Sequence, residues 1–287
     1  MKQSEHPKWN LNLDSLKPVI DYALQEDIGS GDLTTNSLIP IDLMAKATMV
    51  AKSSGIISGL SVAEYIFRAL SSDIEWKTFV HDGDHLETGD LILEISGSYR
   101  TLLTGERLAL NFMQRMSGIA TLTHRCVEEI SNYPAKILDT RKTAPGLRLF
   151  DKYAVLTGGG VNHRIGLYDM VLIKDNHIKI AGGITRAIEE IKKTIPPNIK
   201  LEVEVTNERE VREAITAGAD IIMLDNMTLE AMTESVKLIN GRAKVEASGN
   251  MTIERLKAVA ATGVDFISIG ALTHSVTAFD ISMNITS

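Results

Sequence analysis

Short apolar runs alternate with amphipathic segments throughout the second half of the chain. Four runs of this kind predict buried strands: Leu201–Val205, Ile221–Leu224, Lys244–Ala247 and Phe266–Ile269. Segments with helical spacing follow the first three runs, each after residues with capping chemistry: Glu208–Ala217, Thr228–Ile239 and Thr252–Ala261. Strand and helix recurring in this order predict parallel βαβ units.

Two further apolar runs lie upstream and end in basic residues. Ile137-Leu138 leads to Arg141 and Lys142, and Met170–Ile173 leads to Lys174. Active sites in α/β folds lie just past the ends of buried strands. The stretch 137–177 is therefore the expected centre of the chemistry.

The first hundred residues follow a different pattern. Helical spacing at 14–26 is followed by strand signals at 45–58 and 74–95, and a second segment with helical spacing, 61–70, lies between them. This order predicts a small α+β domain with antiparallel strands. We expect residues 27–40 to form a polar loop. A long helical pattern covers 105–130, and we expect Gly118 to divide it into two helices.

The polar residues at the predicted strand ends recur at a regular interval. Glu204, Asp225, Ser248 and Gly270 are spaced by 21, 23 and 22 residues. Evenly spaced βα units in a closed parallel barrel place such residues on one rim with a single mouth. Alternation within the first of these strands puts Glu202 on the same inward face as Glu204.

Composition limits the kind of ligand. The 287 residues are 44% hydrophobic and 23% charged with a net charge of -7, so we expect a globular protein that binds neither nucleic acid nor membrane. A basic cluster within an acidic chain favours a small polyanionic ligand. Two features favour a cytoplasmic protein: the chain has a single cysteine, Cys126, and its first ten residues contain no apolar run.

The residue types at the rim indicate what that ligand contains. Arg, Lys and His bind carboxylates or phosphates, whereas Glu204 and Asp225 suit Mg²⁺ or sugar hydroxyls. The turn Ser248-Gly249-Asn250 and Gly270 present backbone N–H groups of the kind that cradle phosphate. These features together predict a ligand with a terminal phosphate, a sugar, a metal-bound polyphosphate and a carboxylate partner.

Each residue alone also has a simpler interpretation. Glu204 alone suits half of a buried ion pair, and Arg141-Lys142 suits a solvated pair. Arg107, in the long helical segment, suits a solvated face or a pair with an acid. Their coincidence at strand ends favours a site.

Eight short motifs, in order along almost the whole chain, resemble those of the quinolinate phosphoribosyltransferase family, the decarboxylating nicotinate-nucleotide pyrophosphorylases. The motifs are residues 105–111 (GERLALN), 139–143 (DTRKT), 158–164 (GGGVNHR), 172–177 (LIKDNH), 202–205 (EVEV), 224–226 (LDN), 247–250 (ASGN) and 270–275 (GALTHS). The resemblance implies an α/β fold of the type II phosphoribosyltransferases. An N-terminal α/β sandwich domain (1–116, to which 276–287 return) would precede an incomplete, seven-stranded α/β barrel (117–275). It also implies a homodimer with shared active sites, or a higher oligomer built from it.

The resemblance assigns roles to individual residues. Quinolinate would be bound by Arg107, reaching across the dimer interface, and by Thr140, Arg141, His163, Arg164 and Lys174. Lys142 would lie between the two substrates and act in catalysis together with Glu204 and Asp225, which would hold Mg²⁺ directly or through water. The phosphoribosyl phosphate would be bound by Lys142, Ser248, Gly249, Asn250, Gly270 and Ala271.

The implied reaction joins quinolinate to phosphoribosyl pyrophosphate and releases pyrophosphate and CO2, a step of NAD biosynthesis. Two related enzyme types remain as alternatives: a molybdenum-transport-associated relative and a phosphoribosyltransferase acting on nicotinate. A phosphosugar-binding sensor built on the same barrel is the non-enzymatic alternative. It would need the phosphate cradle but not the paired carboxylates and a second anion clamp.

Overall fold

A computed structural model describes residues 11–286, so the expectation about the first ten residues lies outside it. The chain forms two compact units, and each is described by itself. One, here the sheet unit, holds residues 1–124, 143–159 and 273–287. The other, the barrel unit, holds residues 125–142 and 160–272. The domain division at 116/117 stays a prediction, and the units place 143–159 with the first one.

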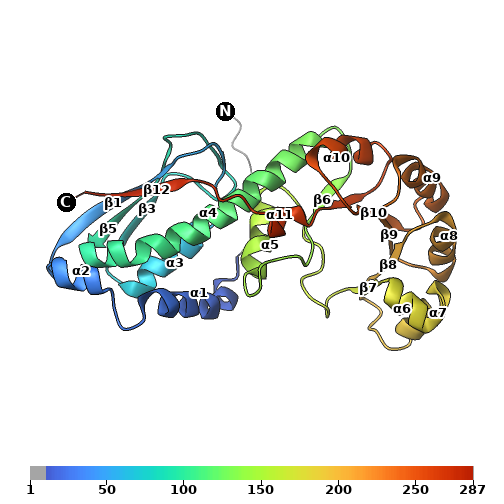
Figure 1. Cartoon of the computed structure of the whole chain (residues 1–287), viewed down its shortest axis with the longest axis horizontal. Helices are drawn as coiled ribbons and strands as arrows, with labels where there is room; N and C mark the ends of the chain where they lie inside the picture. The colour runs from blue at the N-terminus through green and yellow to red at the C-terminus, as the bar shows by residue number, and fades with distance from the viewer. Residues whose placement is uncertain (1–10, 287) are drawn as a thin grey trace. The chain divides into compact units, whose positions relative to one another are not determined.

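The sheet unit is built on an antiparallel sheet of four strands in the order β12-β1-β5-β3 (Figure 1). These strands are β1 (Met44–Ala51), β3 (Glu75–Thr78), β5 (Leu91–Ser98) and β12 (Ile281–Thr286). A separate two-stranded antiparallel sheet pairs β2 (Gly55–Ile56) with β4 (His85–Leu86). Because β12 pairs with β1 along its whole length, the C-terminal residues lie in the same sheet as residues from the beginning of the chain.

Five helices accompany this sheet: α1 (Leu13–Ile28), α2 (Leu33–Leu38), α3 (Leu60–Leu70), α4 (Tyr99–Glu129) and α5 (Arg148–Thr157). Helices α3 and α4 pack closely, since a Cβ at Gly105 would lie 2.7 Å from Phe67 Cε1. Helix α5 belongs to this unit because Phe150 stacks on Phe112 with ring centroids 4.9 Å apart and Asp151 accepts from Arg115 at 2.9 Å.

Two expectations for this region are wrong. The expected loop at 27–40 contains α2, because Asp32 caps it by accepting from Thr35 N at 2.9 Å. The expected break at Gly118 is absent, and α4 continues through it. A side chain at Gly118 would collide with the Thr277 carbonyl, so this glycine permits close approach of a neighbouring chain segment and does not end the helix.

The barrel unit is built on six parallel strands in the order β6-β11-β10-β9-β8-β7 (Figure 1). The strands are β6 (Lys136–Leu138), β7 (Val171–Ile173), β8 (Leu201–Val205), β9 (Ile221–Asp225), β10 (Lys244–Ser248) and β11 (Phe266–Ser268). A single parallel bridge from Leu138 to Val161 adds a seventh position beside β6. Within the described residues β7 pairs only with β8, so the barrel is incomplete, as expected.

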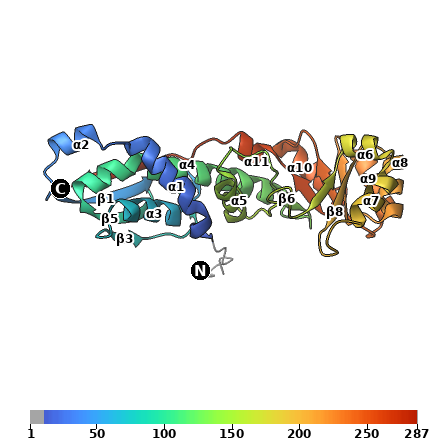
Figure 2. The same cartoon turned by 90° about the horizontal axis from the view of Figure 1, so that it is seen from below.

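Helices cover the outer side of these strands (Figure 2). They are α6 (Asp175–Ala181), α7 (Ile184–Lys192), α8 (Glu208–Ala217), α9 (Leu229–Ile239) and α10 (Ile253–Ala260), with the short α11 (Ala271–His274) following β11. The capping chemistry read from the sequence is present at two of them, where Asn207 accepts from Glu210 N and Thr228 accepts from Ala231 N. No helix among residues 11–286 is long and apolar enough to cross a bilayer.

Candidate active site

The carboxyl ends of the six parallel strands meet at one edge of the barrel unit, because parallel strands share a direction. Lys174 directly follows β7 and Glu204 lies near the end of the adjacent strand β8. Lys174 Nζ donates to Glu204 Oε2 at 2.8 Å, with the two side chains 47% and 17% exposed. This pair is therefore a half-solvated ion pair at the rim.

The next strand ends form a closely packed turn. Asp225 ends β9 and accepts from Asn226 Nδ2 at 2.9 Å, while Asn226 Oδ1 accepts from Asn250 Nδ2 at 3.2 Å. Asn226 N also donates to the carbonyl of Ser248 at 3.0 Å. Asn226, Gly249 and Asn250 all have positive φ, of 52°, 96° and 46°. Such turns point successive N–H groups outward and can bind an anion.

Residues after the two remaining strands complete the rim. Gly270 follows the end of β11, and Ala271 begins α11. After β6, Thr140 Oγ1 accepts from Lys142 N at 3.0 Å, and the Lys142 side chain is exposed. The structure thus brings the phosphate residues of the predicted site, and Lys142, to the same edge.

Two arginines lie near each other beside this edge. Burial and the neighbouring Arg141 both lower the pKa of Arg164. Arg164 Nη1 donates to the Met170 carbonyl at 3.1 Å, and the Nε of Arg141 is buried. Two partly buried guanidinium groups held together repel each other and favour a dianion between them.

Next to Arg164 three ionisable side chains meet in the interior of the barrel unit, here called the His163 cluster: His163, Glu202 of β8 and Glu246 of β10. His163 Nε2 lies 2.9 Å from Glu202 Oε2 and 3.4 Å from Glu246 Oε2. The side chains are 8%, 0% and 1% exposed. The predicted inward direction of Glu202 is confirmed, and its carboxylate ends on the imidazole.

The cluster retains protons at neutral pH. Burial lowers the pKa of His163, but contact with the carboxylates of Glu202 and Glu246 outweighs this effect and raises it. The extra proton belongs to the cluster as a whole and not to the ring alone. Burial and repulsion from Glu246 raise the pKa of Glu202 to about 7. His163 Nδ1 accepts from Arg164 N at 2.8 Å, so the ring carries its proton on Nε2, and we place the second proton of the cluster on a carboxylate. Whichever of the two carboxylates carries this proton, the His163 cluster has one net negative charge.

The His163 cluster also has the spacing of a metal site, because its ligand atoms lie within 4.8 Å of one another. Coordination through Nε2 would require a free lone pair there and a proton on Nδ1. The hydrogen bond from Arg164 N imposes the opposite tautomer. The cluster is therefore better described as a proton-sharing network. Glu204 and Asp225, at the ends of adjacent strands, offer the carboxylate oxygens that suit Mg²⁺.

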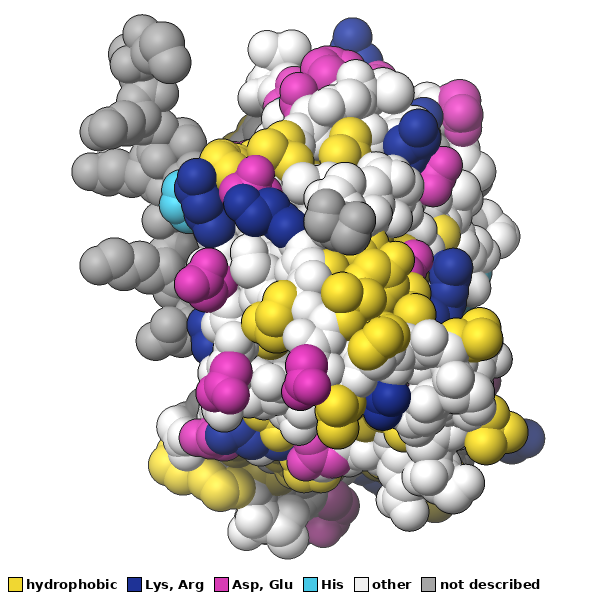
Figure 3. Space-filling view, turned by 90° about the vertical axis from the view of Figure 1, so that its left-hand side faces the viewer, with side chains coloured by type: hydrophobic (Ala, Val, Ile, Leu, Met, Phe, Trp, Pro, Cys, Tyr) yellow, Lys and Arg dark blue, Asp and Glu magenta, His cyan; other side chains and the backbone are white. Residues whose placement is uncertain are grey.

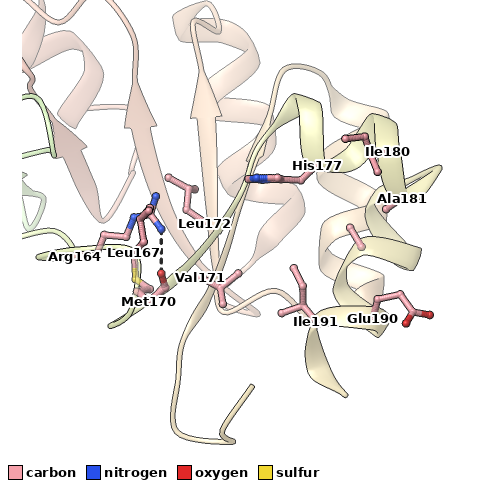
Figure 4. A pocket seen from close by; sticks show the side chains of 11 residues that line it. Arg164, Leu167, Met170, Val171, Leu172, His177, Ile180, Ala181, Glu190 and Ile191 are labelled. Carbon is pink, nitrogen blue, oxygen red and sulfur yellow. Dashed lines mark hydrogen bonds between the residues drawn. The ribbon is translucent and has the colours of Figure 1, made fainter. Parts of the chain in front are cut away.

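An apolar pocket of about 450 Å³ lies at the β7 side of the unit (Figure 4). Arg164, His177 and Glu190 contribute polar groups to it, and apolar side chains of the segment 167–172, α6 and α7 form the rest. Lys174 N donates to His177 Nδ1 at 3.0 Å, which holds that ring at the start of α6. The pocket does not include the carboxylates or the phosphate turn, so we place the chemistry at the rim and not in this pocket.

Arg107 lies in the sheet unit, on α4, with an exposed side chain. Glu246, Asp139 and Asn226 are the residues that sequence reasoning did not single out. Asp139 is fully buried and accepts from His163 N at 2.9 Å. The alternation of Lys244–Ser248 contains the signal for Glu246, because it places this carboxylate on the same face as the strand-end Ser248.

Comparison with known proteins decides the family. The N-terminal domain of quinolinate phosphoribosyl transferase matches residues 32–117, and its C-terminal domain matches residues 119–284. This chain belongs to the quinolinate phosphoribosyltransferase family.

Several relatives align with this family member over nearly its full length. A Bacillus subtilis protein named probable nicotinate-nucleotide pyrophosphorylase (carboxylating) is 45% identical over 276 residues, 96% of this chain and 95% of the relative. Tobacco quinolinate phosphoribosyltransferase (decarboxylating) 2b, mitochondrial, is 45% identical over 99% of this chain and 85% of its own. The NadC crystal structure from Streptococcus pyogenes superposes with a TM-score of 0.94 at 42% identity, covering 96% and 98% of the two chains. The predicted type II phosphoribosyltransferase fold is thereby confirmed.

Proposed function

We propose that this protein transfers the phosphoribosyl group of phosphoribosyl pyrophosphate to quinolinate, forming nicotinate mononucleotide, pyrophosphate and CO2 in NAD biosynthesis. The observation that carries the proposal is one edge of the barrel unit that combines cations, paired carboxylates and a phosphate-type turn. Family membership and the names of the relatives support the same reaction.

The cations are assigned to the pyridine dicarboxylate. Arg141 lies close enough to Arg164 to lower the pKa of Arg164, and Lys174 directly follows β7. A guanidinium group binds a carboxylate through two parallel hydrogen bonds, so this set holds the two adjacent carboxylates of quinolinate. Thr140 and His163 are assigned to quinolinate as well.

The other half of the rim is assigned to phosphoribosyl pyrophosphate. The turn 248–250, with Gly270 and Ala271, binds the 5′-phosphate through backbone N–H groups. Glu204 and Asp225 face the ribose and the metal, and Lys142 lies between the substrates. Mg²⁺, bound by these carboxylates directly or through water, supplies charge neutralisation for the departing pyrophosphate.

The chemistry needs positioning more than proton transfer. Loss of pyrophosphate leaves positive charge on the ribose, and the pyridine nitrogen attacks C1 with its own lone pair. No general base is required for that step. The positively charged ring nitrogen then stabilises the electron pair left on the neighbouring ring carbon when its carboxylate leaves as CO2, and that carbon takes up a proton from solvent. Fixed charges at the rim therefore contribute mainly by orientation and electrostatic stabilisation.

We infer a homodimer in which Arg107 of one subunit completes the site of the other. Two exposed apolar groups support an interface. Hydrophobic side chains gather on the face of the sheet unit seen in Figure 3, and this unit exposes Leu33, Leu38, Ile41 and Met44. The barrel unit exposes Leu167, Tyr168 and Ile180 near the edge strand β7. Patches of this kind mark association surfaces.

We also infer a cytoplasmic location, since the chain's one cysteine, Cys126, is buried and unpaired and so suits a reducing compartment.

The test compares quinolinate with nicotinate at matched concentrations, with phosphoribosyl pyrophosphate and Mg²⁺ present and CO2 captured. Nicotinate leaves part of the cation set desolvated and unpaired, which costs about 1–3 kcal/mol. We expect quinolinate to be preferred by about ten- to hundredfold, with CO2 released in equal amount to the mononucleotide. Comparable turnover of nicotinate would favour the nicotinate-specific alternative, and absence of any mononucleotide would favour the sensor.

A further inference from the structure

The two glutamates of the His163 cluster have no role in the reaction as described. Glu202 and Glu246 are 0% and 1% exposed. The Oε1 atoms of both are buried without a hydrogen-bond partner among the described residues. Burying a carboxylate in this way is unfavourable unless nearby charge compensates it. His163 and the neighbouring Arg164 supply such charge.

The cluster is connected to the arginines through the main chain around His163. His163 Nε2 contacts Glu202, its Nδ1 accepts from Arg164 N at 2.8 Å, and its N donates to Asp139 Oδ1 at 2.9 Å. Asp139 lies two residues before Arg141 in the loop after β6. Through its ring and its main-chain N–H together, His163 therefore links β8 and β10 to both segments that carry the guanidinium groups.

Charge provides a second connection. The Glu202 carboxylate raises the pKa of Arg164, opposing burial and Arg141, which lower it. Without substrate, two neighbouring guanidinium groups repel each other and would move apart. The negative charge of Glu202 near Arg164 partly offsets this repulsion. It also keeps the two groups in the geometry that a dicarboxylate requires.

We propose that Glu202 and Glu246 are positioning residues for quinolinate, acting through His163 to fix the main chain that carries Arg164, with Glu202 supplying counter-charge to Arg164. This inference rests on the proposed function. It assigns a role in acceptor binding to two buried residues that do not touch the substrate.

The test uses Glu202→Gln and Glu246→Gln, which keep side-chain shape and remove charge. Each has a matched control, an aspartate that accepts a hydrogen bond from the main chain of the same strand. Asp220 accepts from Leu201 N at 2.8 Å at the start of β8, and Asp265 accepts from Val245 N at 2.9 Å at the start of β10. Asp220→Asn and Asp265→Asn weaken these strands at the end opposite the rim.

We expect both Gln variants to raise KM for quinolinate about tenfold or more while KM for phosphoribosyl pyrophosphate changes less than about twofold. The Asn controls should lower Tm and leave both KM values within about twofold. The inference is overturned if Gln variants and controls behave alike, or if both substrates are affected equally. Wild-type turnover of quinolinate tests the proposed function. The positioning role is tested separately, by the ratio of the two KM values in the variants.

A measurement on the wild-type protein covers the case in which the Gln variants do not fold. The ¹⁵N resonances of His163 should show a protonated Nε2 and an unprotonated Nδ1. They should shift when quinolinate saturates the protein and remain in place with phosphoribosyl pyrophosphate alone. Resonances that do not shift when quinolinate binds, or a proton on Nδ1 instead of Nε2, would refute the link between the cluster and the acceptor site.

Discussion

Replacing Gly249 with alanine tests the phosphate turn most directly. Gly249 has φ of 96°, a region that L-residues avoid. An added Cβ would lie 2.5 Å from Asn226 Cγ and 2.9 Å from Asn226 N, and would overlap Asn226 Oδ1 as well. One of these neighbours is main chain, so the side chain of Asn226 cannot relieve the whole clash by rotating.

The magnitude follows from two parts. The positive φ alone costs a non-glycine residue about 1 kcal/mol. Displacing Asn226 breaks its hydrogen bonds to Asn250 and Asp225, at 3.2 and 2.9 Å, which contribute about 1 kcal/mol each. We therefore expect Gly249→Ala to lower the free energy of unfolding by about 3 kcal/mol. In a protein of this size that corresponds to a fall in Tm of roughly 6–12 °C.

Gly241→Ala is the matched control. Gly241 has φ of 73°, but an added Cβ would meet no atom within 4 Å. This variant isolates the backbone cost, and we expect a loss of about 1 kcal/mol. Chemical denaturation of both variants gives the difference, which measures the collision with Asn226.

Kinetics then separate structure from function. We expect Gly249→Ala to raise KM for phosphoribosyl pyrophosphate and leave KM for quinolinate unchanged, because the N–H groups of residues 248–250 would no longer converge. Gly241→Ala should leave both unchanged. The reasoning is wrong if Gly249→Ala is no less stable than Gly241→Ala, and the phosphate assignment is wrong if KM for phosphoribosyl pyrophosphate does not change.

Three further predictions concern other parts of the molecule. Arg107→Ala and Lys174→Ala should each be inactive yet folded, and mixing them should restore part of the activity in heterodimers; heterodimers that form but stay inactive would exclude a shared site. Glu204→Gln and Asp225→Asn should weaken the response to Mg²⁺ and phosphoribosyl pyrophosphate more than quinolinate binding, and an unaltered Mg²⁺ titration at full turnover would contradict the metal assignment. Burial raises the pKa of the Cys126 thiol to about 11, so at pH 8 the native protein should resist alkylation that the unfolded chain undergoes, and rapid labelling of native protein would show the thiol to be accessible.

Particular segments show where sequence reasoning succeeded. Strand β8 and helix α8 match their predicted limits residue for residue, because apolar alternation and the Asn207 cap are local signals. The strand-end positions of Glu204 and Asp225 followed from the spacing of the units, and that of Lys174 from the apolar run 170–173 before it. Helix α2 was missed because a six-residue helix leaves little periodicity to detect. Gly118 was misjudged because its reason, the Thr277 carbonyl, comes from a distant part of the chain.

The sequence by itself determined the order of elements, the parallel barrel and the set of residues along its rim, since each depends on short-range patterns and on a regular repeat. Only the tertiary structure decided which charges meet. The contact between His163, Glu202 and Glu246 joins three segments far apart in the chain, and the tautomer of the ring depends on a main-chain N–H of the next residue. Burial sets the protonation of such groups, and burial is a property of the packed molecule that no local pattern contains.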